Sequence, residues 1–115
     1  MHRTVNNLEE IKTKINQFKP DLQNKIKIIA VSKTFSLKDI KPIIEYNHQD
    51  FGENKVQEAI DKWTDIKKIN QKIKLHLIGR LQTNKVKFAL KIFDYIHSLD
   101  SEKLANKIAD EQTKQ

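Results

Sequence analysis

The sequence contains no cysteine, only two glycines and two prolines, and no apolar run long enough to span a membrane. Without cysteine the chain forms neither disulfides nor thiolate metal sites, which excludes the disulfide-rich secreted class. The two glycines, Gly52 and Gly79, lie too far apart for a glycine-rich phosphate loop. The first residues include no apolar segment typical of a signal peptide. We therefore expect a soluble, cytoplasmic protein that does not bind membranes.

Basic residues outnumber acidic residues, 22 to 15, and give a net charge of +7. Such an excess is compatible with a nucleic-acid partner. However, the lysines are spread along the whole chain between Asp and Glu residues, and no basic stripe interleaved with aromatic residues occurs. A basic nucleic-acid-binding module is therefore the last-ranked hypothesis. The four histidines are too scattered in the sequence to predict a zinc site.

Short apolar segments alternate with longer segments of helical periodicity. After a first helix, which should follow an N-cap at Thr4, Asn6 or Asn7, we expect four strand–helix units. The strands are predicted at residues 28–31, 50–51, 74–78 and 95–97, and the helices after them begin near residues 36, 56, 82 and 101. This alternation predicts an α/β fold with a parallel sheet. The chain's 115 residues suffice for one domain, whereas a complete eight-stranded α/β barrel needs about 250.

Lys33 follows the first predicted strand almost directly. Residues 28–31 are four consecutive apolar residues, a pattern typical of a strand covered on both faces. Folds of the α/β class place their chemistry at the carboxyl ends of such strands. Desolvation of a lysine favours the neutral, nucleophilic amine that a Schiff base with an aldehyde requires. The alternative interpretation is that Lys33 is an ordinary solvated surface charge.

Polar residues also follow the other predicted strands, and in a parallel sheet they should share one edge with Lys33. They are Glu53, Asn54, Arg80, Gln82, Asn84 and Asp100. We consider two roles for Glu53. It is either a base or an orienting group for Lys33, or, as we favour, an acid in the first turn of the third helix that interacts with the helix dipole.

Four motifs occur in a fixed order. They are Ala-Val-Ser-Lys-Thr at 30–34, Asp-Phe-Gly-Glu-Asn-Lys-Val-Gln-Glu-Ala at 50–59, His-Leu-Ile-Gly-Arg-Leu-Gln-Thr-Asn-Lys at 76–85, and Ile-His-Ser-Leu-Asp-Ser at 96–101. Together they resemble the pyridoxal-phosphate homeostasis family, also called YggS or PROSC proteins. Each motif alone is weak, but the series is specific, and the resemblance covers nearly the whole chain.

The resemblance implies an alanine-racemase-type, TIM-like barrel that is preceded by an N-terminal helix. Residues 1–115 would form a single domain, the N-terminal half of that barrel with about four strands. The cofactor would be pyridoxal 5′-phosphate (PLP), bound as a Schiff base to Lys33. The same resemblance implies that Asn54, His76 and Gly79 also bind the cofactor, with Asn54 beside it and His76 and Gly79 at the neighbouring strand end. The family's phosphate-binding elements lie in the half of the barrel that this sequence does not contain.

The functional implication is PLP binding in intracellular vitamin B6 homeostasis, without robust catalytic turnover. The implied partners are PLP and, as recipients, PLP-dependent apo-enzymes. A PLP-dependent amino-acid racemase is the alternative, but it needs a second acid or base on the opposite face of the cofactor ring, for which the sequence offers no clear candidate. A half-barrel also leaves its first and fourth strands as open edges. We therefore expect that the chain either self-associates, with two halves completing a barrel, or is an incomplete fragment.

Overall fold

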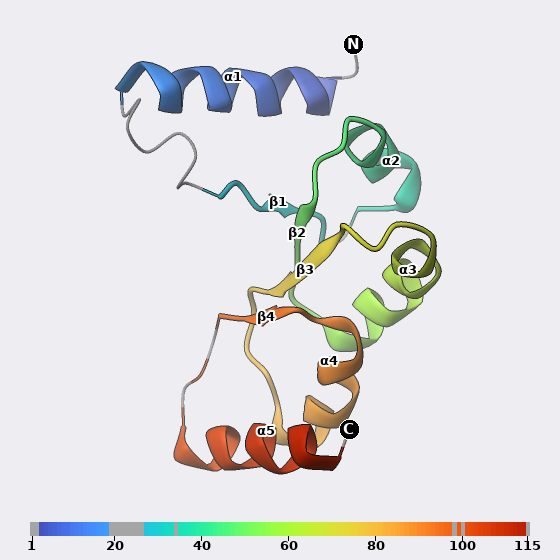
Figure 1. Cartoon of the computed structure of the whole chain (residues 1–115), viewed down its shortest axis with the longest axis vertical. Helices are drawn as coiled ribbons and strands as arrows, with labels where there is room; N and C mark the ends of the chain where they lie inside the picture. Colours follow the sequence, from blue (N-terminus) through green and yellow to red (C-terminus); the bar gives the residue numbers. More distant parts are fainter. Residues whose placement is uncertain (1–2, 19–26, 34, 98, 100, 115) are drawn as a thin grey trace. The chain divides into compact units, whose positions relative to one another are not determined.

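The computed structural model describes residues 3–18, 27–33, 35–97, 99 and 101–114. The elements in chain order are α1 (Arg3–Phe18), β1 (Ala30–Val31), α2 (Leu37–Glu45), β2 (Asp50–Glu53), α3 (Val56–Ile69), β3 (Lys74–Leu77), η2 (Thr83–Lys85), α4 (Val86–Ile92), β4 (Tyr95–Ile96) and α5 (Glu102–Lys114) (Figure 1). None of the described helices combines the length and the apolar character needed to cross a membrane. The chain divides into two compact units, residues 1–28 with 35–48 and residues 29–34 with 49–115.

The first unit pairs α1 with α2. Val5 and Leu8 of α1 and Ile40 of α2 are buried, which is the amphipathic packing that their spacing predicts. The Tyr46 hydroxyl, just after α2, donates a hydrogen bond to Glu9, and this bond raises the pKa of Tyr46. The ammonium of Lys12 lies 5.8 Å from the centre of the Tyr46 ring.

Of the two helix starts in this unit, the predicted start of α2 agrees with the structure and that of α1 does not. Ser36 is the N-cap residue of α2, as expected, although its hydroxyl binds Asp39 Oδ2 at 3.2 Å and makes no cap bond to the backbone. The prediction for α1 is wrong, because the helix already begins at Arg3. All three proposed caps therefore lie inside the helix.

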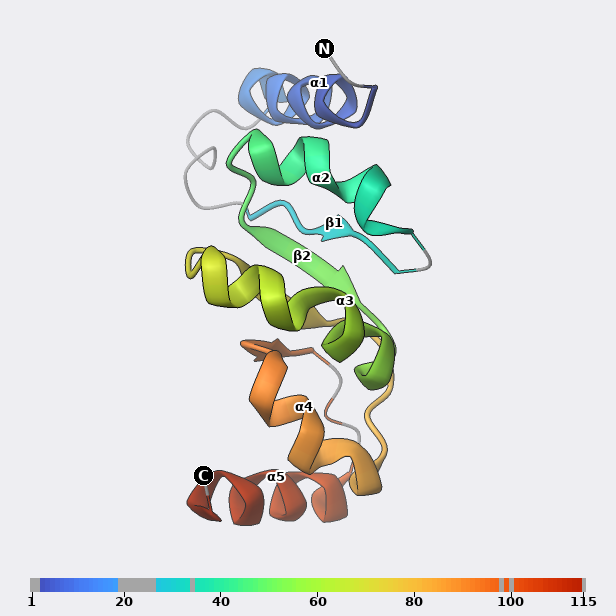
Figure 2. The same cartoon turned by 90° about the vertical axis from the view of Figure 1, so that its right-hand side faces the viewer.

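The second unit is a four-stranded parallel sheet in the order β1-β2-β3-β4. Helices α3 and α4 lie on the same side of β2, β3 and β4, and Figure 2 views the sheet from this helix side (Figures 1 and 2). The apolar side chains between the sheet and these helices are buried: Phe51, Ala59, Trp63, Leu75, Leu77, Val86 and Ala89. The predicted α/β class, with four parallel strands alternating with helices, is confirmed.

The predicted strand boundaries need correction, by one residue at the ends of β3 and β4 and by two residues in β1 and β2. The first strand is shorter than predicted, with β1 limited to Ala30–Val31, and Val31 is 49% exposed. The expectation that this strand is covered on both faces is therefore wrong. The second strand is longer than predicted, because the ladder with β3 continues until Glu53 pairs with Leu77.

The last helix, α5, continues past Glu111 to Lys114. The Glu111 side chain is only 6% exposed, and its Oε1 lies 3.0 Å from Lys107 Nζ and 3.6 Å from Lys114 Nζ. The hydrogen bond from Lys107 lowers the pKa of Glu111, with further lowering by the charges of both lysines against a raising effect of burial. These ion pairs, one turn apart, support the final turns of the helix.

Candidate functional site

The hydrogen-bond ladder of the sheet continues past the ends of its strands. The bonds run from Ser32 N to Gly52 O (2.9 Å), from Ile78 N to Glu53 O (3.0 Å) and from His97 N to Leu77 O (3.0 Å). The residues that follow β1, β3 and β4 are therefore held at one edge of the sheet, as the parallel arrangement predicts. The candidate site lies at this edge.

Lys33 lies in the turn directly after this edge of β1. Its side chain is exposed, whereas Ser32 before it is 2% exposed. The amine is thus accessible to a ligand, although the backbone on its N-terminal side is anchored. An accessible amine on an anchored backbone can react with an aldehyde in a defined direction.

Asn54 and Gly79 are brought into direct contact at the ends of β2 and β3. A Cβ atom on Gly79 would lie 2.8 Å from Asn54 Cβ and 3.0 Å from the Asn54 carbonyl oxygen, so only glycine fits here. The Asn54 Oδ1 atom is buried and has no hydrogen-bond partner among the described residues. A buried amide oxygen without a partner is costly, and a ligand that donates a hydrogen bond would satisfy it.

His76 is buried on β3, and both of its ring nitrogens are engaged. Nε2 lies 2.9 Å from Asp50 Oδ1, and Nδ1 lies 2.9 Å from His97 Nε2. The ring also stacks on Tyr95, with centroids 4.5 Å apart and an interplanar angle of 12°. These contacts hold the His76 ring in one orientation on its face of the sheet.

The strand register explains why these rings meet. One row of paired residues runs across the four strands and consists of Val31, Gly52, His76 and Tyr95. Because Phe51 faces α3, strand alternation puts this row on the opposite face, where Tyr95 is 43% exposed. Our sequence reasoning missed Asp50 and His97 as partners of His76. The alternation of side chains along each strand could have shown which residues share a face. The sequence does not show the register between strands, which decides which of these residues meet.

Glu53 is the centre of a second cluster, on the helix side of the sheet. Its carboxylate is fully buried and accepts hydrogen bonds from Ser32 Oγ, from Lys62 Nζ (3.1 Å) and from Trp63 Nε1 (3.1 Å). The favoured interpretation of Glu53 as a first-turn helix acid is wrong, since Glu53 ends β2 and α3 begins at Val56. Sequence reasoning missed Ser32, Lys62 and Trp63 as partners of Glu53.

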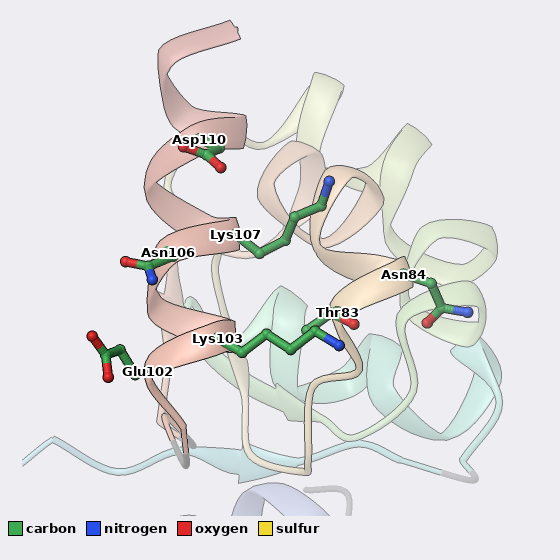
Figure 3. Close-up of a pocket in the computed structure, with 7 residues that line it drawn as sticks. All are labelled: Thr83, Asn84, Glu102, Lys103, Asn106, Lys107 and Asp110. Atoms are coloured by element: carbon green, nitrogen blue, oxygen red, sulfur yellow. The ribbon is translucent and has the colours of Figure 1, made fainter.

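Of the remaining residues predicted at this edge, Arg80 and Gln82 are exposed, and Asp100 lies outside the described residues. Asn84 instead lines a groove of about 690 Å³ between η2 and α5, toward which Lys103 and Lys107 extend (Figure 3). This groove contains none of the four residues Lys33, Asn54, His76 and Gly79.

Comparison with known proteins gives consistent matches. No protein-family model matches the chain. The chain is 44% identical over 102 residues to a pyridoxal phosphate homeostasis protein of Buchnera aphidicola from Schizaphis graminum, covering 86% of this chain and 44% of the relative. It is 39% identical over 109 residues to the protein of the same name from the Baizongia pistaciae strain of Buchnera aphidicola, covering 91% and 47%.

A solved structure agrees with these matches. PipY of Synechococcus elongatus, whose structure was determined with PLP bound, is 34% identical with a TM-score of 0.75, and the match covers 90% of this chain and 49% of PipY. The chain thus spans about half the length of the relatives that it matches.

Proposed function

Because the chain belongs to the pyridoxal phosphate homeostasis protein family over the half of a relative that it spans, we propose that it binds PLP through Lys33 and serves intracellular PLP homeostasis. We further propose that residues 1–115 form a single domain, the N-terminal half of an alanine-racemase-like barrel. The proposed partners are PLP and PLP-dependent apo-enzymes that receive it. The proposed location is the cytoplasm.

The observation that carries the proposal is the placement of Lys33. Its amine is exposed at the carboxyl edge of a parallel sheet, directly after the buried and fully bonded Ser32. When bound, PLP supplies an aldehyde and an electron-withdrawing ring. The Lys33 amine would hold the cofactor through this aldehyde, because a neutral amine condenses with an aldehyde to a Schiff base with loss of water.

Neighbouring residues support the same site. The buried Oδ1 of Asn54 has no hydrogen-bond partner among the described residues and would accept a bond from a donor group of the cofactor. The absence of a side chain at Gly79 lets Asn54 approach the end of β3. The ring of His76 on β3 is held in place by Asp50 and His97. Lys33 and Asn54 are therefore the proposed contacts, and Gly79 and His76 shape the strand ends around them.

The test is chemical trapping on the full chain. PLP is added, the imine is reduced with borohydride, and the modified lysines are identified by mass spectrometry after digestion. Free lysine is added as a competitor to define nonspecific imines. We expect close to one label per chain, at Lys33, and loss of that label in Lys33→Ala.

The matched control is Lys68→Ala. Lys68 is an exposed lysine in the last turn of α3, near the amino end of β3 and thus toward the opposite edge of the sheet. This variant should keep the full label at Lys33. A label distributed over many lysines, with no preference for Lys33 in the folded chain, would overturn the proposal.

A further inference from the structure

A buried carboxylate, that of Glu53, accepts a hydrogen bond from Ser32, the residue before Lys33. Oε2 of Glu53 receives three donors: the Ser32 hydroxyl, Lys62 Nζ at 3.1 Å and Trp63 Nε1 at 3.1 Å. A carboxylate is tolerated in the protein interior only where it is paired and hydrogen-bonded. The three donors therefore form one cluster with Glu53, drawn from β2, from α3 and from the end of β1.

The same cluster holds the peptide group that joins Ser32 to Lys33. Lys62 Nζ lies 2.7 Å from the Ser32 carbonyl oxygen, and the Lys62 side chain is only 9% exposed. The Ser32 N–H donates to the Gly52 carbonyl at 2.9 Å, and the Ser32 hydroxyl lies 3.2 Å from that oxygen. Every polar group of Ser32 is thus bound to β2 or α3.

The packing of Trp63 supports this cluster from the side of α3. Trp63 is fully buried, and its ring packs on Phe51 of β2 with centroids 4.8 Å apart. Its indole N–H is therefore fixed in direction toward Glu53. An aromatic side chain fixed in this way limits the movement of the carboxylate, and through it the movement of Ser32.

We propose that Glu53, Lys62 and Trp63 are positioning residues that fix Ser32 and thereby set the direction in which the Lys33 amine meets an aldehyde. This inference rests on the proposed function of Lys33. Reaction rates depend steeply on placement, since a shift of about 1 Å can cost about a hundredfold. Release of Ser32 should therefore slow imine formation at Lys33 even though Lys33 itself is unchanged.

The variants are chosen to separate position from bulk. Glu53→Gln keeps the shape of the side chain and removes its charge, and Lys62→Met keeps the aliphatic stem and removes the amine. The control is Glu58→Gln, because Glu58 Oε1 pairs with the same lysine at 3.3 Å from a more exposed position on α3. All rates are measured well below the unfolding temperature of each variant, which circular dichroism determines.

The first readout is the rate of PLP imine formation, followed by absorbance, with the fraction trapped at Lys33 found by mass spectrometry. Glu53→Gln and Lys62→Met should form the Lys33 imine about tenfold more slowly, whereas Glu58→Gln should match the unaltered chain. Folded Glu53→Gln and Lys62→Met variants that label Lys33 at the unaltered rate would overturn the inference, since a merely structural cluster lowers only the unfolding temperature.

The second readout does not use PLP. Hydrogen–deuterium exchange should become faster in the peptide containing Ser32 and Lys33 in Glu53→Gln and stay unchanged in Glu58→Gln. If Glu53→Gln does not fold, Ser32→Ala, which removes one hydroxyl, replaces it in both measurements.

The inference and the proposed function fail in different ways. If PLP does not label Lys33 in the unaltered chain, the proposed function is wrong. The rate at which reductive methylation with formaldehyde modifies Lys33 then reports the reactivity of its amine without PLP. Slower methylation in Glu53→Gln, and not in Glu58→Gln, would still support the positioning role, and equal rates would overturn it.

Discussion

Gly79 lies so close to Asn54 that a Cβ at position 79 would be 2.8 Å from the Asn54 Cβ atom. The Asn54 backbone would have to move as well, because its carbonyl oxygen would be 3.0 Å away. Gly52 differs, since the three atoms nearest to a Cβ there would be methyl carbons of Ile29 and Ile78, the nearest at 3.1 Å. Side-chain ends can turn away more easily than backbone can.

We therefore predict that Gly79→Ala lowers the free energy of unfolding by about 1–3 kcal/mol, the usual effect of overpacking. It should also weaken PLP trapping at Lys33, because Asn54 is displaced. Gly52→Ala, the matched control, should have the smaller effect on both. Urea unfolding and borohydride trapping measure the two effects. Equal losses in the two variants would contradict the role given to the Gly79–Asn54 contact.

Trp63→Phe should destabilise the chain through one lost hydrogen bond. Phenylalanine retains the packing on Phe51 but leaves Glu53 with one donor fewer in a fully buried position. The expected loss is about 1–3 kcal/mol in the free energy of unfolding, measured by circular dichroism in urea because the only tryptophan is removed. A variant as stable as the unaltered chain would show that the indole N–H does not stabilise the buried carboxylate.

Acid should weaken α5 through Glu111. The hydrogen bond from Lys107 lowers the pKa of Glu111 in the folded chain below its ordinary value of 4.5. A lowered pKa adds stability that is present above the unfolded value and is lost as the pH falls through the folded value. The urea midpoint of the unaltered chain should therefore exceed that of Glu111→Gln at pH 7, and the difference should shrink below about pH 4.5. A difference that stays constant down to pH 2 would exclude this assignment.

The sheet edges should promote association between chains. β1 and β4 are the outer strands of the sheet, and Val31 and Tyr95 on them are 49% and 43% exposed. Edge strands with exposed apolar residues are templates for pairing. Size-exclusion chromatography with light scattering should show a mass that rises above the monomer with concentration, and Val31→Lys should reduce it. A monomer at every concentration would contradict the prediction.

The sequence was most informative where a local pattern has one structural meaning. The alternation of short apolar and longer helical segments predicted four strand–helix units, and all four occur in the parallel sheet. Polar residues that follow strands predicted the site edge, and the structure brings Asn54 into contact with Gly79 there. The strand boundaries did not follow from the sequence, because pairing with a neighbouring strand extends β2 to Glu53 and limits β1 to two residues.

The sequence by itself determined the fold class, the family and the place of Lys33 after the first strand, since apolar periodicity and motif order are properties of neighbouring residues. Only the tertiary structure decided which side chains are hydrogen-bonded to one another. Glu53 became the acceptor for Ser32, Lys62 and Trp63, and His76 joined Asp50 to His97. The physical reason is strand register, which determines the face each side chain takes and the residues it meets across the sheet.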